Sequence, residues 1–436
     1  MELLNKHILV AGLGVSGTAV ARFLTKRGAR VTVTDTARKS DLSPYLESLS
    51  DLDIKFELGT HSSQTFENAD LIIISPGVPH TILPIKKAKK RNIPVWSEIE
   101  LAGRFINEPI IAVTGTNGKT TTTTLLGKMI EDSGLKPFVG GNIGNPLIEY
   151  VDNKEKADVV VAELSSFQLD TIDTFKPAVS VLLNITEDHM DRYADLNAYA
   201  TSKKRIFKNQ QENDTAILNG SDQLINKITE HIKAKKRFFY HNRTTDNKSD
   251  ALNSLVFSVP GLPGKHNIEN ASAAALAAIS IGCSLKGIQT ALNSFKGLPH
   301  RLEYIKTVNN IRFFDDSKAT NVDAVAKAID AFDKPVVLIM GGRNKGASFG
   351  NLSDLVRKKI KKLIVIGEAK YNIISELGHL AKTRSADSMK DAVFLAYTSA
   401  APGDIVLLSP ACSSFDMFNS YAHRGEVFRK SIEYLK

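Results

Sequence analysis

Short apolar runs, each followed by a polar or glycine-rich loop, recur along the whole chain. Such runs are typical of strands buried inside a parallel sheet, and the apolar residues at helical spacing between them predict helices that cover the sheet. The predicted strands comprise residues 7–10, 30–34, 71–74, 110–113, 157–162, 178–183, 311–314, 335–340, 363–366 and 404–408. The alternation of strands and helices predicts an α/β fold.

Two interruptions of this pattern indicate boundaries between domains. Asn107-Glu108-Pro109 has the composition of a linker, and the alternation of strands and helices restarts after Leu298-Pro299-His300. At about 150 residues per domain, the chain of 436 residues has room for three domains, each with its own core. We therefore expect domains at residues 1–108, 109–297 and 298–436.

The strand at 110–113 leads into the loop Gly115-Thr116-Asn117-Gly118, and Lys119 and Thr120 open the helix that follows. Glycines let backbone N–H groups turn toward an anion. The helix N-terminus, the lysine ammonium and the threonine hydroxyl suit phosphates and a magnesium ion. Only two residues separate the glycines, whereas the general P-loop pattern has about four. The order of strand, loop and lysine still predicts a nucleoside triphosphate site in a P-loop mononucleotide-binding domain.

Polar residues follow two further strands of this predicted central sheet. Glu163 directly follows one apolar run, and Glu187, Asp188 and His189 come soon after the next. Because the carboxyl ends of parallel strands meet at one edge of a sheet, we expect these side chains to face the bound phosphates. An imidazole beside two carboxylates is also a candidate metal ligand.

The first predicted domain opens with a glycine-rich turn. Gly12, Gly14 and Gly17 form a GxGxxG pattern between the first strand and the first helix, and Asp35 ends the second strand. In dinucleotide-binding folds an acid near this position contacts a ribose, so we expect a Rossmann-like domain that binds a nucleotide. A nicotinamide-dependent oxidoreductase would account for this turn but not for the loop at 115–118.

Composition limits the partners and the location. Apolar residues make up 42% of the chain and the net charge is +9. The basic runs at 86–91, 233–237 and 357–362 are scattered and mostly lack interleaved aromatic residues, so we interpret them as solvated helix faces and expect small anionic substrates rather than nucleic acid. Cys283 and Cys412 form no CxxC pattern, and neither a signal peptide nor an apolar run of about 18 residues is evident. We expect a cytoplasmic protein without a membrane partner.

Seven short motifs, spread over the three predicted domains, together resemble the Mur ligase family. They are residues 115–121 (GTNGKTT), 163–169 (ELSSFQL), 184–193 (NITEDHMDRY), 266–270 (HNIEN), 298–303 (LPHRLE), 316–321 (DSKATN) and 409–416 (SPACSSFD). The short glycine spacing is the form that this family uses. The resemblance implies three α/β domains, with Rossmann-like first and third domains around the central P-loop domain.

The resemblance also implies an ATP-dependent amide ligase of peptidoglycan precursor synthesis. The chain lacks the Asp-Asn-Pro-Arg signature of relatives that add lysine or diaminopimelate, so the implied reaction adds D-glutamate to UDP-N-acetylmuramoyl-L-alanine. ATP would convert the substrate carboxylate into an acyl phosphate, which the amine of D-glutamate attacks. A folate-polyglutamate ligase is the nearer alternative, and a nucleotide-sensing module without chemistry is another.

The functional residues of the family carry over to matching positions of this chain. Those implied to bind ATP are Gly115, Thr116, Asn117, Gly118, Lys119, Thr120, Thr121, Asn142, Asn270, Arg301, Asp316 and Lys318. Those implied to hold two magnesium ions are Thr120, Glu163, His189 and Lys203. Lys119, His189 and Lys203 would be catalytic.

Lys203 is similar in position to the family's carbamylated lysine. Carbon dioxide would turn its cationic ammonium into a carboxylate-like anion that can bind a metal. The adjacent Lys204 is a rival position, and an unmodified lysine is the third possibility.

The other two substrates would bind in the outer domains. The residues implied to hold UDP are Gly14, Ser16, Asp35 and Thr36. Those implied to hold D-glutamate are Thr320, Lys345, Ser414 and Tyr421. Lys345 would pair with the second carboxylate of D-glutamate, and Tyr421 would form an aromatic wall.

Overall fold

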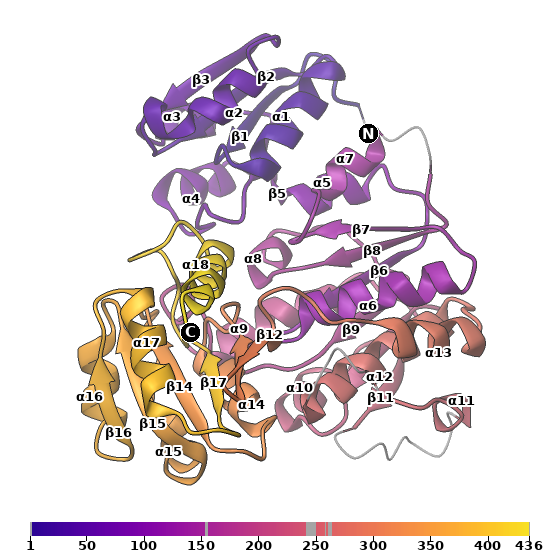
Figure 1. Ribbon diagram of the computed structural model, residues 1–436. Coiled ribbons are helices and arrows are strands. Elements are labelled where there is room, and N and C mark those ends of the chain that lie inside the picture. The colour runs from indigo at the N-terminus through magenta and orange to yellow at the C-terminus, as the bar shows by residue number, and fades with distance from the viewer. Residues whose placement is uncertain (1, 153–155, 241–249, 258, 260–263, 436) are drawn as a thin grey trace. The chain divides into compact units, whose positions relative to one another are not determined.

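The computed structural model describes residues 2–152, 156–240, 250–257, 259 and 264–435 (Figure 1). By its contacts the chain divides into two compact units. The first comprises Met1–Ile185, Asn197–Leu255 and Ser272–Ala291, and the second comprises Thr186–Leu196, Val256–Ala271 and Leu292–Lys436. Both units consist of sheets covered by helices, so the predicted α/β class is confirmed. The boundaries expected at residues 108 and 297 stay a prediction.

The first unit opens with a five-stranded parallel sheet in the order β3-β2-β1-β4-β5. Its strands are β1 (His7–Ala11), β2 (Arg30–Asp35), β3 (Ile54–Leu58), β4 (Leu71–Ile74) and β5 (Val95–Ser97). Its helices are α1 (Val15–Lys26), α2 (Ser43–Ser48), α3 (Ser63–Glu67), α4 (Leu83–Lys90) and α5 (Glu98–Gly103). The order of the first four strands is that of a Rossmann-like half, which confirms the expected fold of this region.

The second sheet of the same unit has six parallel strands in the order β11-β10-β9-β6-β8-β7. They are β6 (Ile110–Thr114), β7 (Pro137–Gly141), β8 (Val159–Glu163), β9 (Val179–Leu182), β10 (Thr215–Asn219) and β11 (Lys235–Phe239). The helices of this part of the chain are α6 (Lys119–Asp132), α7 (Leu147–Val151), α8 (Ser166–Leu169), α9 (Leu196–Lys204), α10 (Gln223–Ile228), α11 (Asp250–Asn253), α12 (Lys265–Ser280) and α13 (Leu285–Ser294). Helix α6 packs across β6, β7 and β8 (Figure 1).

Helix α5 joins the two sheets of the first unit through buried carboxylates. Glu100 is fully buried, and its oxygens accept hydrogen bonds from the backbone N–H groups of Asp173, Thr174 and Phe175 at 2.8 to 3.1 Å. Those three residues lie between α8 and β9. One side chain of the first sheet's last helix therefore fixes a connection of the second sheet.

The sheet of the second unit has the order β12-β13-β17-β14-β15-β16, and only β12 is antiparallel to its neighbour. The strands are β12 (Glu303–Val308), β13 (Ile311–Asp315), β14 (Val336–Gly341), β15 (Ile360–Ile366), β16 (Lys382–Ser385) and β17 (Ile405–Leu408). The helices are α14 (Val322–Asp330), α15 (Ser353–Lys359), α16 (Lys370–Leu377), α17 (Met389–Ser399) and α18 (Tyr421–Glu433).

Strand β14 shows why this sheet is covered on both faces. Leu338 and Met340 pack into a core that includes apolar residues of α14, α15 and α16, whereas Val337 and Ile339 pack into a second core with α17 and α18. Successive side chains of a strand point to opposite faces, so a continuous apolar run needs a cover on each side. This is the pattern from which the strand was predicted.

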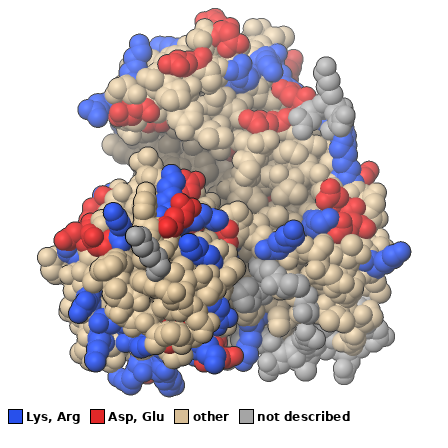
Figure 2. All heavy atoms as spheres, viewed as in Figure 1, with Lys and Arg blue, Asp and Glu red and all other residues tan. Residues whose placement is uncertain are grey.

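The surface carries mixed charge. Basic and acidic side chains are interspersed over the face shown in Figure 2. The run at 233–237 was expected to be a helix face, but residues 235–237 are exposed positions of β11, an edge strand. Lysines on an edge strand hinder pairing with another chain. Among the described residues, none of the helices is both long and apolar enough to span a bilayer.

Candidate active site

The loop between β6 and α6 has the geometry of an anion cradle. Gly115 and Gly118 adopt φ angles of +156° and +84°, a region that disfavours side chains. The loop is anchored to the end of β9 by Asn184, whose backbone carbonyl accepts from Thr116 N at 2.9 Å. The Asn184 side chain accepts from Asn117 N at 2.8 Å and donates to Asn117 O at 3.0 Å. Asn184 is the first residue of the motif at 184–193, but its role as an anchor of the loop was not predicted.

Two lysines converge on this loop from different helices. Lys119 Nζ donates to the carbonyls of Gly115 and Thr116, both at 2.8 Å. Lys203 Nζ, from α9, also donates to Gly115 O at 2.8 Å and lies 4.5 Å from the ring centre of Tyr199. The Lys203 residue is 1% exposed, whereas the neighbouring Lys204 is exposed. Of the two rival lysines, only Lys203 is therefore buried at the loop.

Glu163, the last residue of β8, supplies a buried carboxylate. It is 2% exposed, and its Oε1 accepts a hydrogen bond from Asn142 Nδ2 at 2.8 Å. Its Oε2 is buried and has no hydrogen-bond partner within the described part of the chain. A buried anionic oxygen without a partner is costly, and a hard divalent cation with oxygen ligands would satisfy it. Glu163 therefore fits the predicted magnesium ligand, with the Thr120 hydroxyl as a second oxygen donor of the right kind.

His189 belongs to the second unit, whereas Lys119, Glu163 and Lys203 belong to the first. His189 has a φ of 59°, which is unusual for a residue with a side chain. Its neighbour Asp188 accepts from Asn321 Nδ2 at 3.3 Å, and Asp188 Oδ1 lies 3.7 Å from Lys345 Nζ. The segment that carries His189 is thus tied to loops that follow β13 and β14.

The remaining predicted ATP residues divide between the units. Asn142 lies in the first unit, and Asn270, Arg301, Asp316 and Lys318 lie in the second. Asn270 Nδ2 donates to the side chain of Asn267 at 3.2 Å, so both asparagines expected at the start of α12 lie together.

Asp316 is the acid among these candidates, and it is buried. It accepts from Ser409 Oγ at 2.8 Å and from Leu302 N at 3.2 Å, and burial raises its pKa to about 7. An acid of this kind can change protonation state near neutral pH, which is a property of many functional carboxylates.

The candidate amino-acid residues lie on loops at the carboxyl edge of the third sheet. Ser414 follows β17 and is 2% exposed, Lys345 follows β14, and Tyr421 opens α18. Lys318 Nζ lies 3.8 Å from the ring centre of Tyr421. The structure therefore brings together one residue assigned to ATP and one assigned to D-glutamate. Thr320 lies in the loop after β13, between Lys318 and the α14 cap.

The glycine turn of the first sheet uses Asp35 in a way that was not predicted. Asp35 accepts from Leu13 N at 2.7 Å through one carboxylate oxygen and from Ala37 N at 2.8 Å through the other. Its carboxylate therefore holds the turn that contains Gly14 and the turn that contains Thr36. Thr36 is exposed and Ser16 is partly exposed.

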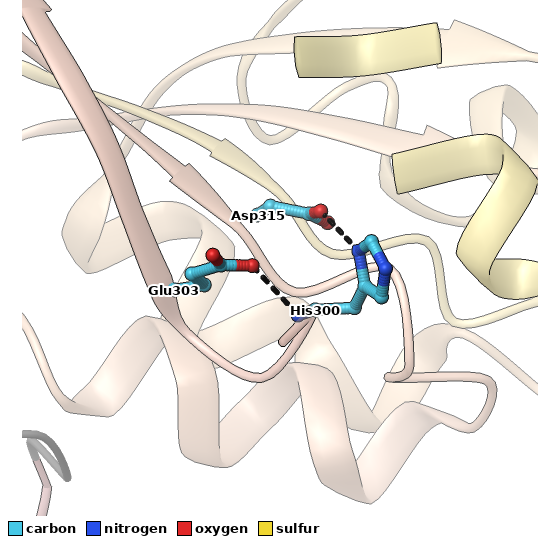
Figure 3. Close-up of side chains that lie close together, drawn as sticks. All are labelled: His300, Glu303 and Asp315. Carbon is cyan, nitrogen blue, oxygen red and sulfur yellow. Dashed lines mark hydrogen bonds and ion pairs between the residues drawn. The ribbon is translucent and has the colours of Figure 1, made fainter. Parts of the chain in front are cut away.

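His300, Glu303 and Asp315 form a cluster that sequence reasoning missed (Figure 3). Their ligand-type atoms lie within 4.8 Å of one another, which resembles a metal site. His300 Nδ1 is instead 2.6 Å from Asp315 Oδ2, and His300 N donates to Glu303 at 2.9 Å. The bond to Asp315 raises the pKa of His300.

The polar atoms of this cluster already have partners within the protein. A Cβ atom on Gly425 of α18 would lie 2.2 Å from His300 Nδ1, and Arg429 donates to Glu303 at 2.8 Å. We therefore interpret the cluster as a hydrogen-bonded support of the turn that carries Arg301.

Arg424 is the other functional candidate that sequence reasoning missed. It is fully buried in α18, and it donates to Ser317 Oγ at 2.9 Å, Ser317 O at 2.8 Å and Cys412 O at 3.1 Å. Burial lowers its pKa to about 10. The guanidinium ties the loop after β13 to the loop after β17. A single arginine in an amphipathic helix carries no sequence signal for this role.

The chain matches family models over all three sheets. These are the Mur ligase MurD-like N-terminal domain at residues 6–97, the Mur ligase middle domain at 113–278 and the Mur ligase glutamate ligase domain at 300–412. The matches bear out the three-domain Mur ligase fold that the motifs implied.

Curated relatives are similar over their whole length. A UDP-N-acetylmuramoylalanine--D-glutamate ligase of Desulfosudis oleivorans is 47% identical, with 100% of this chain and 98% of that protein covered. A protein of the same name from Geotalea uraniireducens is 48% identical, with 100% and 99% covered.

Solved structures share the fold at lower identity. UDP-N-acetylmuramate-alanine ligase MurC from Thermotoga maritima has a TM-score of 0.63 and 21% identity, with 99% of this chain and 100% of that chain covered. MurF ligase from Thermotoga maritima in complex with ADP has a TM-score of 0.63 and 18% identity, with 99% and 98% covered. Given the domain matches and the full-length relatives, this chain belongs to the Mur ligase family.

Proposed function

We infer that this protein is an ATP-dependent ligase that adds D-glutamate to UDP-N-acetylmuramoyl-L-alanine during peptidoglycan precursor synthesis. The observation that carries the chemistry is the convergence of Lys119 and the buried Lys203 on the Gly115 carbonyl of an anion-binding loop. The choice of substrates is supported by full-length relatives that bear the name of this ligase.

The proposed reaction has two steps. The terminal carboxylate of UDP-N-acetylmuramoyl-L-alanine attacks the γ-phosphate of ATP, which forms an acyl phosphate and releases ADP. The amine of D-glutamate then attacks the acyl carbon, and the tetrahedral intermediate loses phosphate to leave an amide. Phosphoryl transfer depends on positioning and charge neutralisation, so the N-terminus of α6 and the Lys119 ammonium would hold the phosphates in line.

The hydroxyl of Thr120 would hold the first magnesium ion, Glu163 would serve both metals, and His189 would bind the second. Modified Lys203 would supply a further anionic ligand. Bound magnesium would neutralise charge on the phosphates. The buried Oε2 of Glu163, which has no hydrogen-bond partner among the residues that the structure describes, supports this assignment.

Carbamylation of Lys203 is part of the proposal. The neutral amine would attack carbon dioxide, form a C–N bond and lose one proton, which leaves an anionic carbamate. The ammonium of Lys119, which donates to the same Gly115 carbonyl, favours an anion at this position over a second cation. The exposure of Lys204 supports Lys203 as the modified residue.

The substrate contacts follow from the same resemblance. Gly14, Ser16, Asp35 and Thr36 would bind or shape the UDP site, with Asp35 acting through the turns that it holds. Thr320, Lys345, Ser414 and Tyr421 would bind D-glutamate. We also propose a cytoplasmic location, because Cys283 and Cys412 are both free thiols.

A panel assay tests this function. Phosphate release is measured with ATP, UDP-N-acetylmuramoyl-L-alanine and each of a set of D- and L-amino acids. We expect release with D-glutamate and no comparable release with L-glutamate. A folate-polyglutamate ligase is the nearer alternative. Phosphate release that needs a folate substrate and L-glutamate would favour that alternative.

A further inference from the structure

Four strands of the third sheet end side by side, and their loops carry the candidate amino-acid residues. In the sheet, β17 lies between β13 and β14, and β15 follows β14. Ser414 lies in the loop after β17, and Lys345 lies in the loop after β14. Neither loop has regular structure of its own at these positions, so other contacts must fix the two side chains.

Ser413 provides the first of these contacts. Its backbone N donates to Arg343 O at 3.0 Å, its hydroxyl donates to the same oxygen at 3.0 Å, and its carbonyl accepts from Arg343 N at 3.0 Å. This isolated bridge joins the loop after β17 to the loop after β14 immediately before Ser414.

Asp416 provides the second contact, on the other side of Ser414. Its Oδ2 accepts from the backbone N of Glu368 at 3.0 Å, in the turn between β15 and α16. Gly367 in that turn has a φ of +74°, and a Cβ atom there would lie 2.3 Å from Asp416 Oδ2. The close approach of the carboxylate therefore depends on a glycine at position 367.

The negative charge of Asp416 is partly compensated by a nearby cation. Its Oδ1 is buried and lacks a hydrogen-bond partner within the described residues, while the buried guanidinium of Arg424 lies within electrostatic reach. Removal of the carboxylate would release the turn at Glu368 and leave Arg424 with less compensating charge. The hydrogen bond itself is exposed, but the carboxylate that accepts it is half-buried and has one buried oxygen.

We propose that Asp416 is a positioning residue for the incoming amino acid. It acts through Ser414, which lies between the bridge at Ser413 and the hydrogen bond from Glu368 N to Asp416. Asp416 does not itself contact the substrate. This inference rests on the proposed function, because that function assigns Ser414 to the amino-acid site. It predicts that removing the contact between Asp416 and Glu368 raises the KM for D-glutamate but leaves the KM for ATP unchanged.

The test measures KM for all three substrates and kcat in the full-length enzyme with Asp416→Ala, Asp416→Asn and Glu368→Gln. Loss of one hydrogen bond to a charged group should raise the KM for D-glutamate about tenfold in Asp416→Ala. The KM values for ATP and UDP-N-acetylmuramoyl-L-alanine should stay within about twofold of those of the unaltered enzyme. Asp416→Asn keeps an oxygen that can accept from Glu368 N, so its KM for D-glutamate should stay close to that of the unaltered enzyme.

Glu368→Gln is the matched control. It removes the ion pair between Glu368 and Arg343, whose side chains are 55% and 52% exposed, but it keeps the backbone N–H that Asp416 binds. Exposed pairs of this kind contribute little, so the KM for D-glutamate should not change. Gly367→Ala disturbs the same contact, because its Cβ would displace the Asp416 carboxylate. It should also raise the KM for D-glutamate alone, so the inference can be tested even if Asp416→Ala does not fold.

The outcomes separate this inference from the proposed function. No D-glutamate-dependent phosphate release by the unaltered enzyme would overturn the proposed function, and this inference with it. If the unaltered enzyme is active, an unchanged KM for D-glutamate in Asp416→Ala and Gly367→Ala would overturn the inference alone. An equal rise in KM for all three substrates would also overturn it, since that result indicates a general structural role.

Discussion

The substitution Glu98→Gln should change how the stability of this protein depends on pH. Glu98 opens α5 and is 2% exposed. Its Oε1 accepts from Ile148 N at 2.6 Å, at the start of α7, while its Oε2 is buried with no hydrogen-bond partner among the residues described. Burial raises the pKa of Glu98 from 4.5 to about 7. The carboxylate is therefore a cost to the folded state at neutral pH.

The sign and size of this cost follow from proton linkage. The folded state binds the proton of Glu98 more tightly than the unfolded chain does, so ionisation destabilises the folded state. The cost is small below about pH 4.5, grows between pH 4.5 and 7, and is complete above pH 7. Each pKa unit corresponds to about 1.4 kcal/mol, so the full cost is on the order of 3 kcal/mol.

The assay is urea unfolding at several pH values, followed by fluorescence of Trp96, the single tryptophan, which lies two residues before Glu98. The unfolding free energy of Glu98→Gln minus that of the unaltered protein should rise by about 3 kcal/mol between pH 4.5 and pH 8. A constant penalty from the new amide group would shift every point equally and leave this rise intact. Glu131→Gln, at a side chain that is 67% exposed, is the control and should show no comparable rise. A difference between Glu98→Gln and the unaltered protein that does not vary with pH would refute the reasoning.

Three further predictions concern the candidate active site. Lys119→Ala removes a cation from the phosphate loop and should lower phosphate release by a factor on the order of 10²–10³; near-normal release would argue against an ATP site at this loop. Lys203→Ala should lose most activity and regain part of it in bicarbonate or acetate, whereas the exposed Lys204→Ala should behave like the unaltered enzyme; full activity of Lys203→Ala would contradict the role of a modified lysine. Glu163→Gln should raise the magnesium concentration for half-maximal activity by about tenfold or more, and a magnesium titration that matches the unaltered enzyme would remove Glu163 from the metal site.

Three buried strands show how an apolar run could be predicted from sequence, whereas the internal strand β10 was missed. Strands β6, β8 and β14 are covered on both faces, so nearly all of their residues are apolar and their ends are marked by glycine or acid. The edge strands β11 and β16 were missed. They carry exposed lysine and arginine, and no apolar run distinguishes them from a solvated helix or loop.

Candidate site residues could be predicted where the residue type and its place after a strand already indicate the chemistry. Contacts that depend on the path of the chain could not be predicted. Lys119 and Glu163 were recognised from their place after a strand, and both lie where that reasoning put them. Asp35 was recognised as an acid at a ribose-binding position, but its two backbone partners depend on the path of the turn. The contact of Asp416 with Glu368 joins residues 48 positions apart, which no local pattern reveals.

The central claim is that ATP activates the substrate carboxylate before an amide forms. The most direct measurement uses UDP-N-acetylmuramoyl-L-alanine with ¹⁸O in both oxygens of its terminal carboxylate, together with ATP and D-glutamate, and follows the label by mass spectrometry. We predict that one ¹⁸O appears in the released phosphate and the other stays in the amide of a D-glutamate adduct. Released phosphate without ¹⁸O, or label in AMP, would contradict the account.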